Sequence, residues 1–338
     1  MAAELQSTIQ ALLSSGKGIL AADESFPTIE KRFTPLGIAS TPENRQAYRD
    51  MLFATPGLGD FISGVILFDE TLHQTSSSGL PFPQVLAAQG IIPGIKVDGG
   101  TTALVNFAEE KMTLGLDGLR ERLNQYREAG ARFTKWRAAI SIGSQLPTAT
   151  CLRTNAQALA LFAALSQEAG LVPIVEPEVL MDGDHTIERC EEVTQAVLQR
   201  VFEALAEYRV SLEGMLLKSG MVLAGRACAQ QAGLEEMAAS TVRCFRRTVP
   251  AAVPGIVFLS GGQDEAGSTQ RLNAIASLGS QPWRLTFSFG RALQDAAMAA
   301  WKGEAANAAA AQKVLLHRAR CNSLAALGRY EPSAEPLA

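Results

Sequence analysis

The sequence has 338 residues, of which 47% are hydrophobic and 19% are charged. This composition is typical of a globular protein with a large core, and the length suits one large α/β barrel or two medium domains. The formal net charge of −4 provides no overall positive field, so neither nucleic acid nor a membrane surface is expected as a partner. An anionic ligand would have to be bound by a local cluster of basic residues.

The N-terminal segment and the cysteines lead us to expect a cytoplasmic protein. Residues 1–18 carry acidic and amide side chains and no long apolar core, so they predict an amphipathic helix rather than a signal peptide. The cysteines form no CxxC pair and their number is odd, which is typical of reduced thiols. They are Cys151, Cys190, Cys228, Cys244 and Cys321. No stretch is apolar enough to predict a membrane span.

Eight short apolar runs rich in β-branched residues predict buried strands. They are residues 16–25, 61–70, 91–98, 133–142, 171–178, 212–218, 255–262 and 283–290. Helical patterns lie between most of them, for example at 117–130 and 187–208. This repeated alternation predicts an α/β fold, a single-domain (β/α)8 TIM barrel with an N-terminal and a C-terminal helix. We expect the domain to span 1–330, followed by a flexible tail at 331–338.

Charged residues end most of the predicted strands, which is where a TIM barrel has its active site. Several of them come in pairs two residues apart, and such residues point to the same face of a strand. The cluster contains Lys96, Lys135, Arg137, Lys218 and Arg291 as cations and Asp23, Asp98, Glu176 and Glu178 as anions. Charges are costly to bury as neutral filling, so the cluster predicts a reaction site. Ion pairs that merely plug the barrel mouth are the alternative.

Three lysines share this predicted cavity, and one of them is favoured as an amine nucleophile. Neighbouring cations and loss of hydration lower the pKa of a lysine from about 10.4 and so favour the neutral amine. Lys96 has Asp98 two residues away, and Lys135 has Arg137. Lys218 ends the most apolar run and has no charged residue two positions away, so the residues favour it by a modest margin.

Glycine-rich segments after the last two predicted strands indicate phosphate binding. They offer hydroxyl groups, unhindered backbone N–H groups and one guanidinium, which together suit an anion. The residues are Ser260, Gly261, Gly262, Ser288, Gly290 and Arg291. A second phosphate would need another basic pole, and Lys31 and Arg32 with Ser25 and Thr28 would supply it.

The sequence predicts no metal site and no nucleotide site. The histidines His73, His185 and His317 are far apart and lack the spacing of metal ligands. Neither GxGxxG nor GxxxxGK[ST] occurs, so neither dinucleotide nor P-loop chemistry is indicated.

Long ordered motifs resemble the class I fructose-1,6-bisphosphate aldolases over nearly the whole chain. They are GKGILAADES, GVILFDETLHQ, GIKVD, TKWR, PIVEPEVL, DGDHTIERC, LLK, FLSGGQ and LTFSFGRALQ. The resemblance implies a TIM barrel, a homotetramer and reversible cleavage of fructose 1,6-bisphosphate in glycolysis and gluconeogenesis. It also implies a covalent lysine imine, without a metal or any other cofactor.

The resemblance further implies roles for individual residues. It makes Lys218 the Schiff-base lysine, Glu176 the main general acid and base with Glu178 close by, and Asp23 a carboxylate that helps deprotonate the substrate hydroxyl. Lys135 becomes the electrostatic partner in iminium formation. The implied substrate-binding residues are Arg32, Lys96, Arg137, Ser260, Gly261, Gly262, Ser288, Gly290, Arg291, Ser25, Thr28, Lys31 and Arg45.

The sequence departs from the animal pattern of this family in several places. Phe26 and Pro27 follow ADES, Ser219 follows the lysine, Phe289 replaces a tyrosine, and the final tyrosine of the animal enzymes is absent. These changes leave the preference among sugar phosphates open. One alternative is therefore a Schiff-base aldolase that prefers fructose 1-phosphate or sedoheptulose 1,7-bisphosphate. A non-catalytic scaffold role is another, although the complete catalytic set argues against it.

Overall fold

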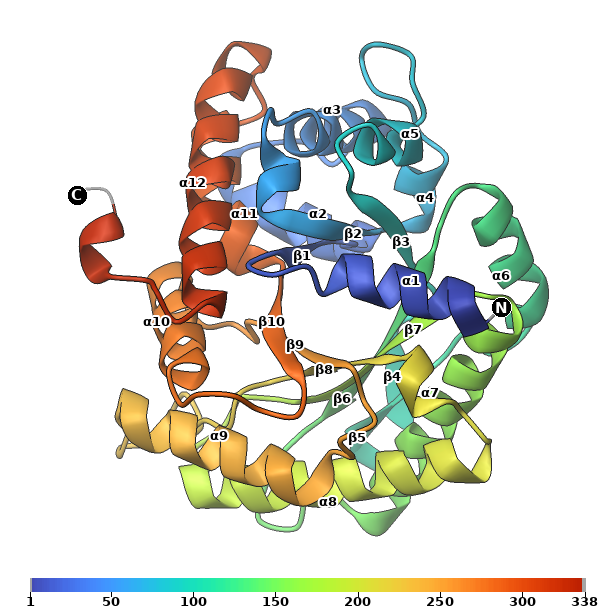
Figure 1. Ribbon diagram of the computed structural model, residues 1–338, viewed down its shortest axis with the longest axis vertical. Helices are drawn as coiled ribbons and strands as arrows, with labels where there is room; N and C mark the ends of the chain where they lie inside the picture. The colour runs from blue at the N-terminus through green and yellow to red at the C-terminus, as the bar shows by residue number, and fades with distance from the viewer. Residues whose placement is uncertain (1, 336–338) are drawn as a thin grey trace.

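The computed structural model describes residues 2–335, which form a closed barrel of parallel strands (Figure 1). The barrel strands are β1 (Gly18–Ala22), β2 (Ile62–Leu67), β3 (Ile92–Lys96), β6 (Phe133–Ile140), β7 (Val172–Val179), β8 (Leu216–Ser219), β9 (Gly255–Phe258) and β10 (Arg284–Phe289). They are neighbours in chain order, and β10 pairs with β1 to close the barrel. The predicted (β/α)8 barrel is confirmed, since each of the eight predicted apolar runs overlaps one of these strands, and β7 and β8 extend one residue beyond their runs.

Helices surround the barrel (Figure 1). They are α1 (Ala2–Leu12), α2 (Phe26–Phe33), α3 (Pro42–Phe53), α4 (Asp69–Leu72), α5 (Phe82–Ala87), α6 (Leu119–Glu128), α7 (Ala149–Glu168), α8 (Ile187–Glu207), α9 (Leu234–Thr248), α10 (Glu265–Ala276), α11 (Arg291–Trp301) and α12 (Ala308–Ala326). At the N-termini of the longer helices, a side chain accepts a hydrogen bond from a backbone N–H group, as Thr148 does for α7 and Thr186 for α8.

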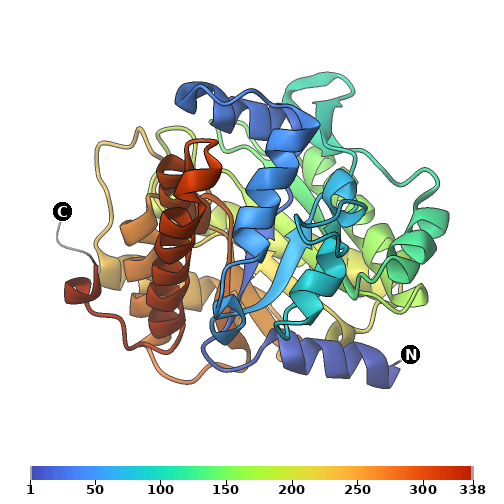
Figure 2. The ribbon, with the colours of Figure 1, turned by 90° about the horizontal axis from the view of Figure 1, so that it is seen from above.

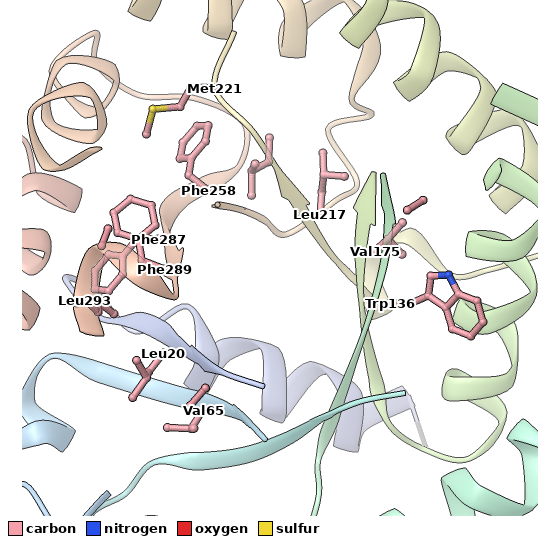
Figure 3. Packing of buried hydrophobic residues seen from close by; sticks show 14 of the residues in the cluster. Leu20, Val65, Trp136, Val175, Leu217, Met221, Phe258, Phe287, Phe289 and Leu293 are labelled. Carbon is pink, nitrogen blue, oxygen red and sulfur yellow. The ribbon is translucent and has the colours of Figure 1, made fainter. Parts of the chain in front are cut away.

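The main hydrophobic core lies between the barrel and the helices. Strand side chains such as Leu20, Val65, Trp136 and Leu217 are fully buried there (Figure 3). Both faces of the parallel strands are covered, which explains why the strands are near-continuous apolar runs in the sequence.

A second, smaller core fills one end of the barrel. Phe133 points into it, and Gly94 gives the ring room, because a Cβ on Gly94 would lie 2.3 Å from the Phe133 ring. Helix α1 lies across this end and adds Leu5, Ile9 and Leu12 to the same cluster (Figure 2). These apolar side chains close this end of the barrel. The opposite end, at the carboxyl ends of the strands, is left open for a site.

A hairpin outside the barrel is not predicted from the sequence. Strands β4 (Thr101–Leu104) and β5 (Phe107–Thr113) form an antiparallel hairpin outside the barrel. Most of its residues are exposed, and Val105 at its tip is 75% exposed. A solvated hairpin of this kind needs little apolar alternation, so the sequence gives no clear signal for it.

The division into a domain at 1–330 and a flexible tail at 331–338 stays a prediction. Within the described part of the tail, Pro332–Ala334 form a short 3-10 turn and Glu335 pairs with Arg318. Residues 336–338 lie outside the described residues. No helix in the described part of the chain is both long and apolar enough to cross a membrane.

Candidate active site

A cavity of about 690 Å³ opens at the carboxyl ends of the barrel strands, opposite α1. Of the residues proposed from the sequence, those that line it are Asp23, Ser25, Thr28, Lys31, Arg32, Lys96, Lys135, Arg137, Glu176, Glu178, Lys218, Ser260, Gly261, Ser288, Gly290 and Arg291. Side chains from seven of the eight barrel strands, or from the loops that follow them, therefore meet in one place, as the strand-end pattern predicts.

The register of neighbouring strands sets the charged side chains side by side. Lys96 of β3 is level with Lys135 of β6, and Arg137 of β6 is level with Glu176 of β7. Lys135 and Arg137 lie two residues apart and share one face, as do Glu176 and Glu178. Alternation along adjacent parallel strands thus aims a block of cations and a block of carboxylates into the same cavity.

Lys218 and Lys135 lie on either side of Glu176. Lys218 Nζ is 3.2 Å from Glu176 Oε1, and Lys135 Nζ is 3.5 Å from Glu176 Oε2. Lys135 Nζ also lies 2.6 Å from Asp23 Oδ2. All four side chains are almost entirely buried. Glu176 Oε2 accepts no hydrogen bond from the described residues, so a lone pair is available for proton transfer.

The ion pair between Asp23 and Lys135 holds both groups charged. Burial alone raises the pKa of Asp23, but the nearby ammonium groups of Lys135 and Lys218 outweigh it and hold the pKa below its ordinary value. Burial likewise lowers the pKa of Lys135, and the carboxylates of Asp23 and Glu176 outweigh it, so the pKa lies above its ordinary value. Lys135 is therefore a fixed cation and a poor nucleophile.

Two further cations of this cluster, Lys96 and Arg137, are also paired. Lys96 Nζ lies 2.5 Å from Asp98 Oδ1 and donates to the Asp98 carbonyl. Arg137 donates through Nε to Glu178. Among Lys96, Lys135 and Lys218, Lys218 has the longest contact to its nearest carboxylate.

One end of the cavity has the features of a phosphate site. Gly261 and Gly262 take left-handed backbone angles, with φ of 55° and 87°, which turn the chain around the pocket. Ser288 Oγ is buried and has no hydrogen-bond partner among the described residues. Arg291 begins helix α11, so the helix N-terminus adds its own N–H groups to the pocket. A dianionic group at this end would meet several donors at once.

Arg226 lies beside the same end, outside the residues that line the cavity, and the sequence analysis does not single it out. Its Nη2 donates to the Gly262 carbonyl at 3.1 Å. A Cβ on Gly262 would lie 2.5 Å from Arg226 Nη2 and 3.3 Å from Arg291 Nη2, so the two guanidinium groups flank this glycine. Neither arginine has a carboxylate partner within residues 2–335. Arg226 lies in the loop between β8 and α9.

The other end of the cavity is electrostatically different. Arg32 donates to Glu24 and to Asp295, the latter at 2.8 Å, so its charge is largely neutralised. Ser25 Oγ and Thr28 Oγ1 are 3.1 Å apart, and the exposed Lys31 has no ion-pair partner in the described part of the chain. The sequence-based prediction did not include Glu24, which lies between two predicted residues and lines the same cavity.

Two of the predicted substrate residues do not line the cavity. Arg45 forms a bidentate ion pair with Glu70 and covers the ring of Phe26, with its guanidinium carbon 4.6 Å from the ring centroid. Gly262 supports the phosphate pocket through its backbone while lying outside the lining residues. Their direct contact with a substrate stays a prediction that the geometry does not favour.

Comparison with known proteins identifies relatives over the full length of the chain. A family model described as fructose-bisphosphate aldolase class-I matches residues 4–338. A probable fructose-bisphosphate aldolase class 1 of Xanthomonas campestris is 55% identical over 329 residues, which cover 97% of this chain and 98% of that protein. Fructose-bisphosphate aldolase 1 of Toxoplasma gondii is 52% identical over 332 residues, which cover 98% of this chain and 92% of that protein.

A solved structure agrees with these relatives. Fructose-bisphosphate aldolase from Plasmodium falciparum, crystallised with TRAP and a small-molecule inhibitor, superposes with a TM-score of 0.96 at 52% identity. The match covers 98% of this chain and 96% of that one. The lysine-centred barrel mouth, the family match and these relatives together show that the chain belongs to the class-I fructose-bisphosphate aldolase family.

Proposed function

We propose that this enzyme cleaves fructose 1,6-bisphosphate reversibly to dihydroxyacetone phosphate and glyceraldehyde 3-phosphate, with Lys218 as the imine-forming amine. Members of the family are lyases, which makes the chain an aldehyde-lyase. The observation that supports the assignment of Lys218 best is its position 3.2 Å from Glu176, inside a cavity with phosphate donors.

The environments of the three lysines support Lys218 as the nucleophile. An amine must lose its proton before it can attack a carbonyl carbon. Asp23 keeps Lys135 protonated, and Asp98 binds Lys96 through both a carboxylate and a carbonyl oxygen. Lys218 is left with one longer contact to Glu176, which lies within reach to remove its proton.

The reaction then uses the carboxylates in turn. The Lys218 amine adds to the ketone carbon of the open-chain sugar, and Glu176 supplies the proton that lets water leave. Lys135 stabilises negative charge that develops on the carbinolamine oxygen. Asp23 helps take the proton from the hydroxyl on the fourth carbon, and the bond between the third and fourth carbons breaks. The iminium accepts the electron pair as an enamine, which protonation and hydrolysis convert to dihydroxyacetone phosphate.

Arg226, Arg291 and the unpartnered Ser288 hydroxyl support binding of one phosphate at the glycine-rich end. We assign this end to the phosphate nearest the ketone, because β9 lies next to β8 and carries the glycine-rich loop close to Lys218. Lys31, Ser25 and Thr28 would meet the second phosphate. The sugar phosphate would thus lie across the cavity, with its reacting carbons over Glu176.

We also propose metal-independent catalysis, a homotetramer and a cytoplasmic location for this aldolase. The lysine imine supplies the electron sink that a Lewis-acid metal would otherwise supply, which supports the first of these. The long shared motifs support the tetramer by resemblance. The odd number of unpaired cysteines supports a reducing compartment.

A borohydride trap tests the central assignment. The enzyme is incubated with EDTA and dihydroxyacetone phosphate, reduced, digested and analysed by mass spectrometry. An adduct on the peptide that contains Lys218 is expected, and Lys218→Met should abolish it. Loss of cleavage in EDTA without an adduct would contradict the imine mechanism.

A preference for a ketose monophosphate is the second candidate, favoured by the neutralised Arg32. If Lys31 binds the second phosphate, Lys31→Ala should lower kcat/KM for fructose 1,6-bisphosphate several-fold and leave fructose 1-phosphate unaffected. Equal turnover of both sugars by the parent enzyme would favour the monophosphate alternative.

A further inference from the structure

We propose that His317, Cys321 and Glu335 form a zinc-binding site outside the catalytic cavity. Cys321 follows His317 by one helical turn on α12, and the short turn of Pro332–Ala334 returns the chain toward the same helix. Within residues 2–335, the potential donor atoms of these three side chains all lie within 4.8 Å of one another. None of the three residues lines the cavity around Lys218.

The separation of sulfur and nitrogen fits a tetrahedral centre. With Zn–S of about 2.3 Å and Zn–N of about 2.0 Å, a tetrahedral angle places these two ligand atoms about 3.5 Å apart. Cys321 Sγ and His317 Nε2 are 3.5 Å apart. His317 Nε2 lies 3.8 Å from Glu335 Oε2, slightly more than the roughly 3.3 Å of such a centre. A small rotation of the partly exposed Glu335 side chain closes that gap.

The carboxylate is held in place by outer-shell partners, as metal ligands commonly are. Tyr330 donates its hydroxyl to Glu335 Oε1 at 2.9 Å, and Arg318 donates to both carboxylate oxygens. Arg318 is itself oriented by Thr269 Oγ1 at 2.6 Å and by the Glu265 carbonyl at 3.1 Å. A chain of buried contacts thus presents Glu335 to the cysteine and the histidine.

The charge of Arg318 does not prevent metal binding. Each carboxylate oxygen has two lone pairs, so one oxygen can accept from a guanidinium and still bind a cation. The ion would replace the thiol proton of Cys321, which passes to solvent. The thiolate and carboxylate would then offset the two positive charges of the ion, and Arg318 would leave the cluster with one net positive charge. His317 and Glu335 are partly exposed and leave an entry path, while Cys321 is 2% exposed.

Three protein ligands leave the fourth position for water. The thiolate and imidazole favour a thiophilic ion over calcium or magnesium, which prefer oxygen ligands. Bound zinc would fasten the turn at 332–334 to helix α12, outside the cavity of the imine chemistry.

Cobalt(II) provides a coloured probe for the intact enzyme. After treatment with EDTA and its removal, one equivalent of Co²⁺ should give a near-ultraviolet sulfur-to-cobalt absorption band, which excess Zn²⁺ should remove. Cys321→Ser should lose the band, and His317→Gln should lower zinc affinity at least about tenfold in a competition with a chelating dye. Zinc should raise the unfolding temperature of the parent but not of Cys321→Ser.

Cys228→Ser is the matched control, since Cys228 is a more accessible thiol outside the cluster and its removal should leave the cobalt band intact. Loss of the band in Cys228→Ser, or zinc binding unchanged by His317→Gln, would overturn the proposal. His317 is partly exposed, so its variant gives an answer even if Cys321→Ser folds poorly. Absence of stoichiometric binding to the parent would show that these residues form only an ion pair.

Discussion

Replacing Glu176 by glutamine tests the centre of the proposed mechanism with little change of shape. The amide keeps an oxygen that can accept from Lys218 at the 3.2 Å contact, so the side chain can hold its place on β7. It removes the buried oxygen Oε2, which has no hydrogen-bond partner in the described structure and lies 3.5 Å from Lys135. The substitution therefore removes proton transfer and one negative charge and leaves the packing largely intact.

The expected loss of catalytic rate in Glu176→Gln follows from those contacts. A positioned acid or base contributes about 10² to 10⁴ in rate, which corresponds to about 3 to 5 kcal/mol of barrier. Glu178 cannot replace Glu176, because Arg137 already binds its carboxylate. Glu176→Gln should therefore lower kcat by about two to four orders of magnitude, and Glu178→Gln, the matched control on the same strand face, should lose less.

Two assays separate the steps. Steady-state cleavage, coupled to reduction of the products, measures kcat, and a borohydride time course with dihydroxyacetone phosphate measures the rate of imine formation on Lys218. Glu176→Gln should slow both while the unfolding transition changes little. A Glu176→Gln enzyme within threefold of the parent would remove Glu176 from the central acid–base role.

Three further outcomes test the surroundings of this centre. Arg226→Ala should raise KM for fructose 1,6-bisphosphate several-fold with kcat nearly unchanged, whereas Arg246→Ala, on the outer surface of α9, should leave KM unaffected. Gly262→Ala should also raise KM, because φ of 87° disfavours a side chain and the new Cβ would collide with Arg226. Asp23 has a lowered pKa in the folded state, so its stabilisation is present above about pH 4 and is lost as the pH falls further. Urea unfolding between about pH 5 and pH 3 should therefore show a shallower loss of stability in Asp23→Asn than in the parent.

The barrel and the catalytic cluster could be predicted because both follow from local rules. Parallel strands buried on two faces are apolar runs, and each run here overlaps one strand. Residues two apart at the end of a strand share a face, which places Lys135 with Arg137 and Glu176 with Glu178 in one cavity. Neither rule requires knowledge of contacts between distant segments.

The charge partners could not be predicted, because they depend on such contacts. Arg32 looks like a free phosphate ligand in the sequence, but Asp295 comes from α11, more than 250 positions away, and neutralises it together with Glu24. Arg45 likewise looks like a free phosphate ligand in the sequence, but it forms an ion pair with Glu70. Arg226 was not predicted, because it does not directly follow a predicted strand, and only the fold brings it to Gly262.

These partners make the two ends of the cavity unequal, which bears on substrate choice. At the glycine-rich end, Arg291 lines the cavity and Arg226 lies beside it. Neither has a carboxylate partner in the described structure, so a phosphate there meets positive charge that is already in place. At the other end a phosphate must compete with Glu24 and Asp295 for Arg32, and the binding gained is reduced by the ion pairs lost. The phosphate next to the ketone should therefore anchor the substrate over Lys218, and the second phosphate should contribute less to affinity. Turnover of ketose monophosphates at a moderate disadvantage follows from this asymmetry, without any change in the imine chemistry.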